Sequence, residues 1–408
     1  MHQPSLTQNK LKFLFIARDK FPPFRVDVST LFGEELVGRG HKIDWLLQSE
    51  QHCDSSFCTT WRGGKAWIGA TTAGSTRISR LRQHFRSISN DLRMFGISRN
   101  ESYDVIQVRD KLIAGLFAIV ASKLSKTRFV YWLSFPIPEA KTYRAQMGLS
   151  RFPIFDYIRG HVFGLLLYRI IMPMADHIFV QSEQMKRDVE QKGINGNKLT
   201  AVPMGVSIEN VRLEDSPPHT NEKIILYLGD ISKIRGMGFL LRVQKKVLEQ
   251  IPDAKLYLVG SAQDPNDVIE LQNESERLGI ASSVIFTGFV EKEEVCSFIR
   301  RASLCVSPLY PTPIYKPASP TKLIEYMANE KAVVVNDHPE QKQVITDSGG
   351  GLCVPYEESS FSRAVIELLE NPVKAAVMGR KGRKYVEKYR SYNVIADIVE
   401  QQYLSLCK

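Results

Sequence analysis

A strand, a proline-rich loop and a helix are predicted to follow one another in the stretch Ser307-Pro-Leu-Tyr-Pro-Thr-Pro-Ile-Tyr-Lys-Pro-Ala-Ser-Pro-Thr-Lys-Leu-Ile-Glu-Tyr-Met-Ala328. The strand begins at residue 302, and the prolines after it exclude a helix before Ser319-Pro320. These two residues read as an N-cap and a proline at the first helical position, which predicts a helix over 319–328. A strand that leads through a loop into a helix is the repeating unit of α/β folds.

The start of this predicted helix has the properties of a phosphate site. It offers unpaired backbone N–H groups, the positive end of the helix dipole and an ammonium group. Four residues form it: Ser319, Pro320, Thr321 and Lys322. Glu325 follows Lys322 by one turn and could accept a hydrogen bond from a sugar hydroxyl. The alternative is a capped helix that carries a Lys322–Glu325 pair on its surface.

The length and composition are those of a two-domain globular protein. A chain of 408 residues is too long for one ordinary core, and 43% hydrophobic and 24% charged residues are typical of soluble proteins. The net charge of +10 favours anionic partners such as nucleotides, phosphorylated lipids or a membrane surface. Because no basic run with interleaved aromatic residues marks a nucleic-acid groove, nucleic acid is not expected as a partner.

The cysteines and the apolar segments indicate a cytoplasmic protein. The six cysteines show no CxxC pair and no metal-ligand spacing, so we expect reduced thiols and neither a metal nor a cofactor. Near the N-terminus, one short apolar piece between charged flanks reads as a first strand rather than a signal peptide. The most apolar segment, 152–174, is interrupted by charged residues and is not expected to span a membrane.

The predicted elements alternate as in two consecutive doubly wound α/β domains. In the first half, apolar runs predict strands at 11–17, 41–47, 103–109, 129–133, 176–181 and 199–203. The second half restarts with strands at 224–228, 255–259, 284–287, 302–307 and 332–336. Residues 214–222, which contain Ser-Pro-Pro-His, read as a linker. We therefore expect one domain over 1–213, a second over 223–388 and a tail, about 389–408, that packs back on the first.

Residues 143–174 alternate arginines with large apolar and aromatic residues. A basic amphipathic stretch of this kind can lie on an anionic membrane. The alternative is an ordinary helix that packs on the sheet through a broad apolar side. The sequence leaves both interpretations open.

A second candidate site follows the first strand of the second domain. The loop Gly229-Asp-Ile-Ser-Lys-Ile-Arg-Gly236 places Lys233 and Arg235 at the carboxyl end of that strand, where ligands bind in open α/β sheets. Two cations on a glycine-bounded loop could hold a diphosphate, and solvated side chains in a turn are the alternative. Gly349-Gly-Gly351 reads either as a plain turn or as flexible backbone near the same site. The GxGxxG, Walker, HExxH and GxSxG motifs are absent.

Seven segments together resemble the retaining family-four glycosyltransferases, whose GT-B architecture has two Rossmann-like domains facing across a cleft. The segments are Gly38-Arg-Gly-His-Lys-Ile-Asp44, Ala175-Asp-His-Ile-Phe-Val-Gln-Ser182, Val202-Pro-Met-Gly-Val206, Leu226-Tyr-Leu-Gly-Asp230, Lys255-Leu-Tyr-Leu-Val-Gly260, Val284-Ile-Phe-Thr-Gly-Phe-Val290 and Ser319-Pro-Thr-Lys-Leu-Ile-Glu-Tyr-Met-Ala328. Each segment is common by itself, whereas their order and spacing are specific. The resemblance covers most of the chain.

This resemblance implies transfer of a sugar from a nucleoside diphosphate sugar, with retention at the anomeric carbon and without a bound metal. Lys233 and Arg235 fall in the loop that holds the donor diphosphate in this family, beside Gly229. Glu325 matches the glutamate that binds the ribose hydroxyls, and the helix start 319–322 matches the segment that meets the phosphates. Positive charge and N–H groups there would stabilise the departing diphosphate.

The chain departs from the family pattern on both sides of the expected site. Pro317 replaces the first glutamate of the family's Glu-seven-residues-Glu motif, and Asp230 replaces the arginine that follows the strand-ending glycine. The Gly-Gly of the first opening loop is missing, and no histidine follows the strand that ends near Ser134. Three residues are candidates for the acceptor side, with plain surface roles as the alternative: Arg25, Asp27 and Arg109.

The sequence thus predicts a cytoplasmic, hexosyltransferase-like enzyme of polysaccharide or glycoconjugate biosynthesis. Its expected partners are a nucleotide-sugar donor and a glycan or lipid-linked glycan acceptor, with peripheral contact to an anionic membrane. Two alternatives stay open. One is a sugar-nucleotide 2-epimerase of the same two-domain fold. The other is a catalytically degenerate member that binds nucleotide or glycan as a scaffold, which the replacements at Asp230 and Pro317 motivate.

Overall fold

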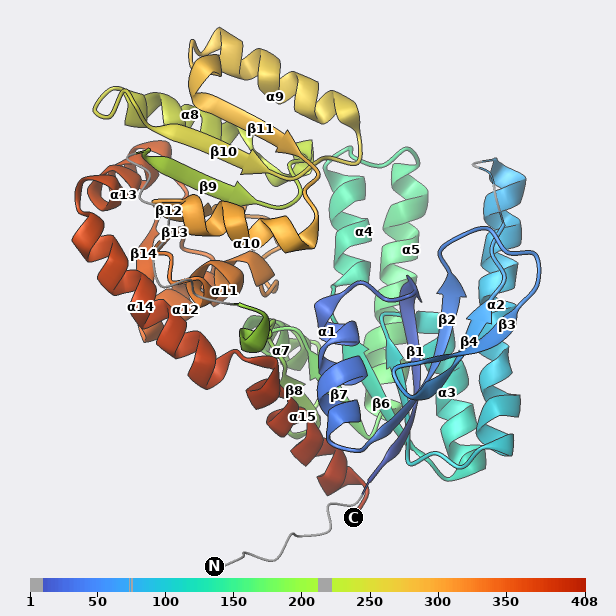
Figure 1. Ribbon diagram of the computed structural model, residues 1–408. Helices are drawn as coiled ribbons and strands as arrows, with labels where there is room; N and C mark the ends of the chain where they lie inside the picture. The colour runs from blue at the N-terminus through green and yellow to red at the C-terminus, as the bar shows by residue number, and fades with distance from the viewer. Residues whose placement is uncertain (1–9, 73, 75, 212–221) are drawn as a thin grey trace, which may run out of the picture. The chain divides into compact units, whose positions relative to one another are not determined.

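The computed structural model describes residues 10–72, 74, 76–211 and 222–408, and the chain divides into two compact units (Figure 1). Unit 1 consists of Met1–Pro203 together with Tyr392–Lys408, and unit 2 of Met204–Ser391. Each unit contains a largely parallel sheet with helices on both faces, so the predicted α/β class with two Rossmann-like domains is confirmed. Of the predicted linker, 214–222, all but Glu222 lies outside the described residues.

The sheet of unit 1 has the strand order β3-β4-β2-β1-β5-β6-β7-β8. Among the described strands of this sheet, every neighbouring pair is parallel except β3 and β4. The strands are β1 (Lys12–Phe21), β2 (Lys42–Ser49), β3 (Phe57–Trp61), β4 (Gly64–Gly69), β5 (Val105–Arg109), β6 (Arg128–Leu133), β7 (His177–Val180) and β8 (Leu199–Ala201).

Two buried hydrophobic cores lie on the two faces of this sheet. One face is covered by α1 (Val26–Ser29), the π-helical η1 (Leu31–Leu36) and α15 (Tyr392–Leu406). The other face is covered by α2 (Arg77–Asn100), α3 (Leu112–Ser125), η2 (Leu167–Ile171), α6 (Met172–Met174) and α7 (Glu183–Gln191). Two further helices, α4 (Ile137–Gln146) and α5 (Pro153–Leu166), pack against each other. Short 3₁₀ turns are η3 (Gly196–Lys198) and η4 (Ile208–Asn210).

Unit 2 has a six-stranded sheet of order β11-β10-β9-β12-β13-β14, in which every described pair is parallel. Its strands are β9 (Ile224–Leu228), β10 (Lys255–Val259), β11 (Val284–Gly288), β12 (Leu304–Ser307), β13 (Val333–Asn336) and β14 (Gly351–Val354). Successive strand residues enter opposite cores, as Ile224 and Ile225 do. Burial on both faces explains why these strands read as continuous apolar runs.

The helices of unit 2 alternate with its strands and cover both faces of the sheet. They are η5 (Lys233–Arg235), α8 (Gly238–Leu248), α9 (Pro265–Arg277), η6 (Ala281–Ser283), α10 (Lys292–Arg301), α11 (Thr321–Ala328), α12 (Pro339–Ser348), α13 (Glu358–Glu370) and α14 (Pro372–Tyr389). Helix α12 and strand β14 were not among the predicted elements. Gly349, at φ +61°, ends α12, and Gly351 begins β14. The plain-turn interpretation is confirmed, and the alternative near the site is wrong because these glycines lie at the amino end of their strand.

The strand orders place a topological switch point in each sheet. In unit 1, β1 pairs with β2 on one side and β5 on the other, and in unit 2, β9 pairs with β10 and β12. In open α/β sheets, the loops after the two strands at such a point leave in opposite directions, and a crevice is expected at the carboxyl ends of those strands. Ligands of open α/β sheets bind there, so a site is expected at each of these two edges.

The last helix, α15, packs on unit 1 through both apolar and charged contacts. Arg39 Nη1 lies 2.6 Å from Asp397 Oδ1 and 2.7 Å from Glu400 Oε2, and His41 Nε2 lies 2.8 Å from Glu400 Oε1. Tyr403 is fully buried beside Phe13. Each of the six cysteines carries a thiol and takes no part in a disulfide. Within the described ranges, none of the helices combines the length and the apolar character that crossing a bilayer requires.

Candidate functional site

The crevice of unit 2 is built around Gly229, which directly follows β9. Its φ of +131° belongs to the region that favours glycine, and a Cβ at this position would lie 3.1 Å from Lys322 Nζ. On its other side, a Cβ at Gly260 would lie only 2.1 Å from the Gly229 carbonyl oxygen, so Gly260 permits the loop to approach β10. Lys322, on α11, therefore lies at the end of β9, although α11 comes much later in the chain than β9.

Lys322 is the cation most closely held at this edge. Its Nζ lies 3.7 Å from the centroid of the Tyr227 ring, on β9. Burial lowers the pKa of Lys322 to about 7, the positive charge of Arg235 acts in the same direction, and Glu325 and Asp230 oppose the shift. This partly buried ammonium therefore rests on an aromatic ring in a site that disfavours its charge, and Glu325 acts on it from one turn further along α11.

Arg235 is held beside the same crevice by a ring and a carboxylate. Its guanidinium lies 4.8 Å from the centroid of the Tyr315 ring, and its Nε lies 3.4 Å from Asp230 Oδ2. Asp230 also accepts hydrogen bonds from the Ser232 backbone N–H at 3.0 Å and hydroxyl at 2.9 Å. The aspartate that replaces the family's arginine thus fixes the position of Arg235 and offsets its charge.

Lys233 lies in a different environment from Arg235, although both stand on η5. Its ammonium pairs with Glu270 of α9 at 2.9 Å, and its side chain is 73% exposed. The backbone N–H of Lys233 donates to Asp267, also on α9, at 2.9 Å. Lys233 and Arg235, which the sequence predicts to act as a pair, therefore have different partners. The charge of Arg235 acts on Lys322, whereas Lys233 contacts α9.

The helix start differs from the prediction by two residues. Helix α11 begins at Thr321, with Pro320 as its N-cap and no side chain capping it. The Ser319 hydroxyl accepts a hydrogen bond from the Met204 N–H at 2.9 Å and donates to Glu340 at 3.2 Å, so it is engaged away from the helix. The prediction of a serine cap is wrong for this reason, whereas the first backbone N–H groups of α11 have no capping side chain.

Residues at the end of β13 and just after it hold the proline-rich loop in place. Asn336 Oδ1 accepts from the Leu309 N–H at 2.7 Å, and Asn336 Nδ2 donates to the Leu309 carbonyl at 3.1 Å. His338 Nε2 donates to the Tyr315 carbonyl at 2.8 Å, and burial lowers the pKa of His338. The loop therefore presents the Tyr315 ring to Arg235 from a fixed position. Asn336 and His338 were not predicted, and their signal was a run of polar residues that begins where an apolar strand ends.

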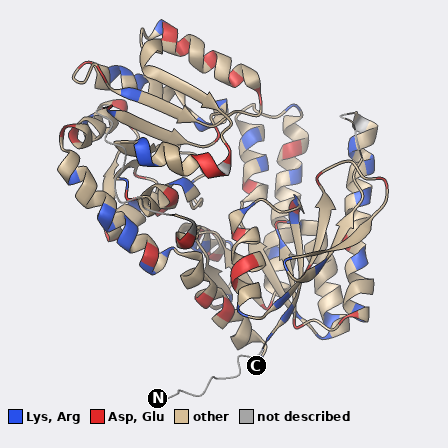
Figure 2. Cartoon of the chain, viewed as in Figure 1, with Lys and Arg blue, Asp and Glu red and all other residues tan. Residues whose placement is uncertain are grey.

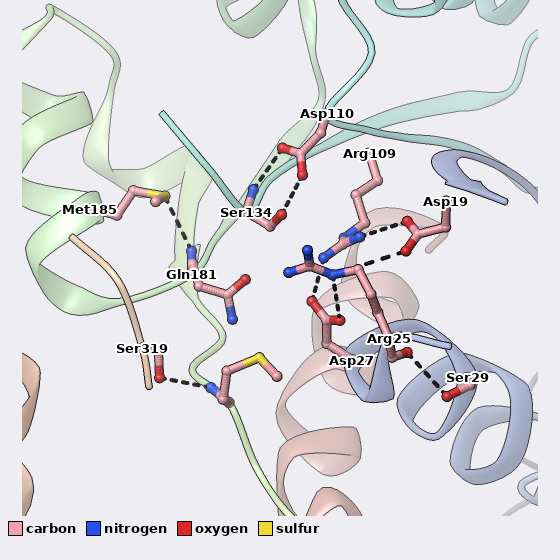
Figure 3. Close-up of polar contacts among 11 residues, drawn as sticks. Asp19, Arg25, Asp27, Ser29, Arg109, Asp110, Ser134, Gln181, Met185 and Ser319 are labelled. Carbon is pink, nitrogen blue, oxygen red and sulfur yellow. Dashed lines mark hydrogen bonds and ion pairs between the residues drawn. The ribbon is translucent and has the colours of Figure 1, made fainter. Parts of the chain in front are cut away.

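A second polar cluster lies at the switch point of unit 1 (Figure 3). Arg109, the last residue of β5, is buried and pairs with Asp19 at 2.8 Å and with Asp27 at 2.5 Å. Arg25 is 43% exposed, and its Nε lies 3.5 Å from Asp27. Surface roles for Arg109 and Asp27 are therefore wrong, because both side chains are buried against each other. An acceptor role stays a prediction.

Three more polar residues at this edge were not predicted. Asp110 follows β5 and accepts hydrogen bonds from the Ser134 N–H at 2.9 Å and from the Ser134 hydroxyl. Burial raises the pKa of Asp110 above its ordinary value, against the opposing charge of Arg109. Gln181 follows β7, and its buried side-chain amide finds no hydrogen-bond partner in the described part of the chain. Each of these side chains directly follows a strand, and that position was the available signal.

We expect replacement of Arg109 by leucine to destabilise unit 1 by about 3–5 kcal/mol, because Asp19 and Asp27 would remain buried without their partner. Urea denaturation followed by circular dichroism measures the change. The control is Arg25→Leu, which removes a longer and more exposed contact and should cost at most about 1 kcal/mol. Equal losses in the two variants would contradict the assignment of Arg109 as the centre of the cluster.

Within the described ranges, no group of three or more histidine, cysteine, aspartate or glutamate side chains is arranged to hold a metal ion. The charged groups at the unit 2 crevice that bear on Lys322 are Arg235, Asp230 and Glu325. Anion binding is the chemistry that Lys322, Arg235 and the N–H groups at the start of α11, which no N-cap side chain caps, have in common.

Comparisons with known proteins find glycosyltransferase families over both halves of the chain. The family described as glycosyl transferases group 1 matches residues 211–385, and the family described as glycosyltransferase family 4 matches residues 29–210. A phosphatidyl-myo-inositol mannosyltransferase of Mycobacterium tuberculosis is 28% identical over 246 residues, which cover 57% of this chain and 61% of the relative. An uncharacterised glycosyltransferase of Methanocaldococcus jannaschii is 28% identical over 181 residues, 44% of each chain.

Solved structures share the fold at low sequence identity. Sucrose-phosphate synthase from Thermosynechococcus elongatus superposes with a TM-score of 0.75 at 18% identity, covering 97% of this chain and 99% of that one. HepE of Anabaena, in complex with UDP and glucose, gives a TM-score of 0.69 at 16% identity and covers 96% and 99%. Since the two family matches together run from residue 29 to residue 385, the chain belongs to the family-4 glycosyltransferases of GT-B architecture.

Proposed function

We propose that this glycosyltransferase moves a sugar, with retention and without a metal ion, from a nucleoside diphosphate sugar to a glycan or lipid-linked glycan acceptor. The observation that carries the proposal is the convergence of Lys322, Arg235 and the start of α11 at the switch point of unit 2. A diphosphate bound there would meet two cations and free N–H groups. The complex of HepE with UDP-glucose supports a nucleotide-sugar donor.

In the proposed reaction, the bond between the anomeric carbon and the diphosphate oxygen breaks, and a bond to an acceptor hydroxyl oxygen forms. The acceptor proton leaves with the diphosphate or enters solvent. Lys322 and Arg235 would stabilise the negative charge that grows on the departing diphosphate, where a metal ion would otherwise serve. Asp230 would hold Arg235 on the Tyr315 ring until the more strongly charged diphosphate arrives.

We place the acceptor at the switch point of unit 1. Arg25 is an exposed cation there, and Gln181 carries a buried amide that a sugar hydroxyl could satisfy. Arg109 and Asp27 would act by positioning, since each already holds the other. The net charge of +10 supports a location in the cytoplasm at the inner face of a membrane, where a lipid-linked acceptor of polysaccharide or glycoconjugate biosynthesis would lie.

A thermal-shift screen of nucleoside diphosphates and their sugars tests the donor, since a ligand that binds only the folded state raises its melting temperature. The sugar that binds is then supplied with a panel of glycan and lipid-linked glycan acceptors, and NMR of the product reports the anomeric configuration. We expect retention and full activity with EDTA. Inversion would contradict retention, and loss of activity with EDTA would contradict catalysis without a metal ion. No transfer from any sugar in the panel would contradict the proposed transfer itself.

The same assays separate the two alternatives. A sugar-nucleotide 2-epimerase would convert UDP-N-acetylglucosamine without any acceptor. A degenerate scaffold would bind nucleotide or glycan without turnover, and its binding would be unaffected by removal of both loop cations, Lys233→Ala with Arg235→Ala. Pro317, where the family pattern has a glutamate, follows Tyr315 by two residues in the chain, and the Tyr315 ring contacts Arg235. This replacement close to the proposed site is the reason for testing the scaffold alternative.

Glu325 supplies a further expectation about the nucleotide. We expect Glu325→Gln to weaken binding of the nucleoside diphosphate selected by the screen about tenfold, because a carboxylate accepts ribose hydroxyls more strongly than an amide does. Binding of inorganic pyrophosphate, which has no ribose, should change little. Calorimetry measures both, with Glu370→Gln, an exposed glutamate of α13, as the control. Equal weakening for the two ligands would contradict a ribose contact.

A further inference from the structure

Two helices of unit 1 carry apolar stripes that no part of the described chain covers. On α5 the exposed apolar residues recur at helical spacing, with Ile154 79% and Phe155 61% exposed; the others are Ile158, Val162 and Leu165. In the first half of α2 a similar stripe comprises Ile78, Leu81 and Phe85. Single exposed apolar side chains are ordinary, whereas aligned sets of this size mark an interaction surface.

Only the later parts of these helical segments enter the core of unit 1. From α2 the core takes Met94 and Ile97, and after α5 it takes residues of η2 such as Leu167 and Ile171. The first halves of α2 and α5 contribute no large apolar side chain to a core and extend past the carboxyl ends of the strands (Figure 1). The packed-helix alternative for 143–174 is therefore correct for η2 and wrong for α5.

Cations accompany both stripes. The guanidinium of Arg159 lies 5.8 Å from the Phe155 ring centroid and 5.1 Å from that of Phe163, and Arg151 lies 5.6 Å from that of Phe152. Lysine and arginine also mark α2 and the α4–α5 pair in Figure 2. Further exposed arginines are Arg80, Arg82, Arg144 and Arg169.

The carboxylates in the same segments are already engaged. Asp156 accepts from the Ser150 hydroxyl at 2.5 Å and pairs with Lys141 at 3.3 Å. Glu139 accepts from the Tyr168 hydroxyl at 3.0 Å, and Asp91 of α2 pairs with Lys111. The first half of α2 and α5 both extend past the carboxyl ends of the strands, and their exposed sides are together called here the α2–α5 surface. Both helices combine exposed apolar side chains with an excess of positive charge.

We propose that the α2–α5 surface inserts into the interfacial region of an anionic lipid bilayer. The apolar and aromatic side chains would enter the boundary between headgroups and acyl chains, and the arginines would bind lipid phosphates. Arginine stacked on an aromatic ring keeps its charge near the headgroups while the ring is buried. Membrane binding itself does not depend on the proposed function. Its purpose does, since it would bring the enzyme to the proposed lipid-linked acceptor.

Charge decides between a bilayer and a second copy of the chain as the occupant. In a two-fold contact through this surface, the same residues face one another, so the arginines of both copies would be brought together without matching carboxylates. An anionic bilayer supplies the opposite charge and an apolar layer at the same time. The bilayer is therefore the occupant that satisfies both components of the surface.

Cosedimentation of the full chain with vesicles tests the proposal. Binding is expected to vesicles of phosphatidylcholine mixed with an equal amount of phosphatidylglycerol, and to be weak with phosphatidylcholine alone. The double substitution Ile154→Glu with Ile158→Glu should weaken binding at least about tenfold. The control replaces two isoleucines exposed elsewhere, Ile269→Glu with Ile398→Glu, and should bind as the unsubstituted chain does. Circular dichroism confirms that each variant is folded.

A second measurement reports insertion directly. Phe155→Trp should gain fluorescence that brominated lipids quench, measured against the unsubstituted chain with its own tryptophans. Equal binding by the two double variants, or an unquenched tryptophan at 155, would overturn the proposal. A dimer in solution that the Ile154 and Ile158 substitutions dissolve would overturn it too, because a second copy would then be the occupant. Donor binding is measured separately on the same variants, so failure of the membrane contact and failure of the proposed transfer are distinguishable.

Discussion

Replacement of Lys322 by methionine is expected to weaken nucleoside diphosphate binding by about 10²- to 10³-fold and to stabilise unit 2 at the same time. Binding is lost because the ammonium on the Tyr227 ring would be the cation nearest to the Gly229 backbone and the diphosphate. Stability rises because methionine keeps the apolar stem and removes a charge that burial disfavours. A gain of roughly 1–2 kcal/mol is expected.

The gain in stability should depend on pH in a defined direction. The pKa of Lys322 is about 7 in the folded chain and 10.5 as its ordinary value, so folding releases a proton between these two pH values. The cost of burying the ammonium is present in full below pH 7 and fades as the pH approaches 10.5. The stability difference between Lys322→Met and the unsubstituted chain should therefore shrink from pH 6 toward pH 10. Urea denaturation at several pH values measures it.

The matched control is Lys342→Met, which removes an exposed lysine of α12 in the same unit. Neither binding nor the pH dependence of stability should change in this variant. Retained binding in Lys322→Met, or a loss of stability as large as that of a core substitution, would show that the ammonium has a structural role only.

Arg235→Ala is expected to lower kcat/KM by about 10²- to 10³-fold, whereas Lys233→Ala should stay within about fivefold of the unsubstituted enzyme. The contrast follows from their contacts, since Arg235 lies on the Tyr315 ring beside the crevice and Lys233 pairs with Glu270 at an exposed position. Each serves as the other's control, because both substitutions remove one cation from the same turn. Steady-state kinetics with the identified donor measures both.

A larger loss from Lys233→Ala would reverse this assignment. It would mean that Lys233 leaves Glu270 and turns toward the donor when the diphosphate binds. Equal losses would mean that the loop acts through its net charge rather than through the position of Arg235.

The strands could be predicted from the sequence because their signal is local. Strands β9 and β10 match the predicted ranges 224–228 and 255–259, since parallel strands buried on both faces read as continuous apolar runs. The loop of Lys233 and Arg235 could be placed at the carboxyl end of β9 by the same logic. The different contacts of the Lys233 and Arg235 side chains could not be predicted, because they depend on Tyr315 and Glu270, which lie far away in the chain.

Contacts between distant residues also explain the errors. Ser319 reads as an N-cap, but its hydroxyl is engaged by Met204 and Glu340, so α11 begins later than expected. The cluster around Arg109 depends on Asp19, which lies 90 residues away in the chain. Such pairings follow from the strand order β2-β1-β5, and no local pattern in the sequence records that order.

The central claim, that the donor diphosphate lies against Lys322, is tested most directly by proton uptake on binding. Calorimetry with UDP and GDP at pH 8, in buffers of different ionisation enthalpy, measures the number of protons bound with the ligand. Because the pKa of Lys322 is about 7 in the free chain, its amine is mostly neutral at pH 8, and an adjacent diphosphate would protonate it. Uptake close to one proton is predicted for the unsubstituted chain and none for Lys322→Met. Binding without proton uptake, or uptake that persists in Lys322→Met, would contradict the claim.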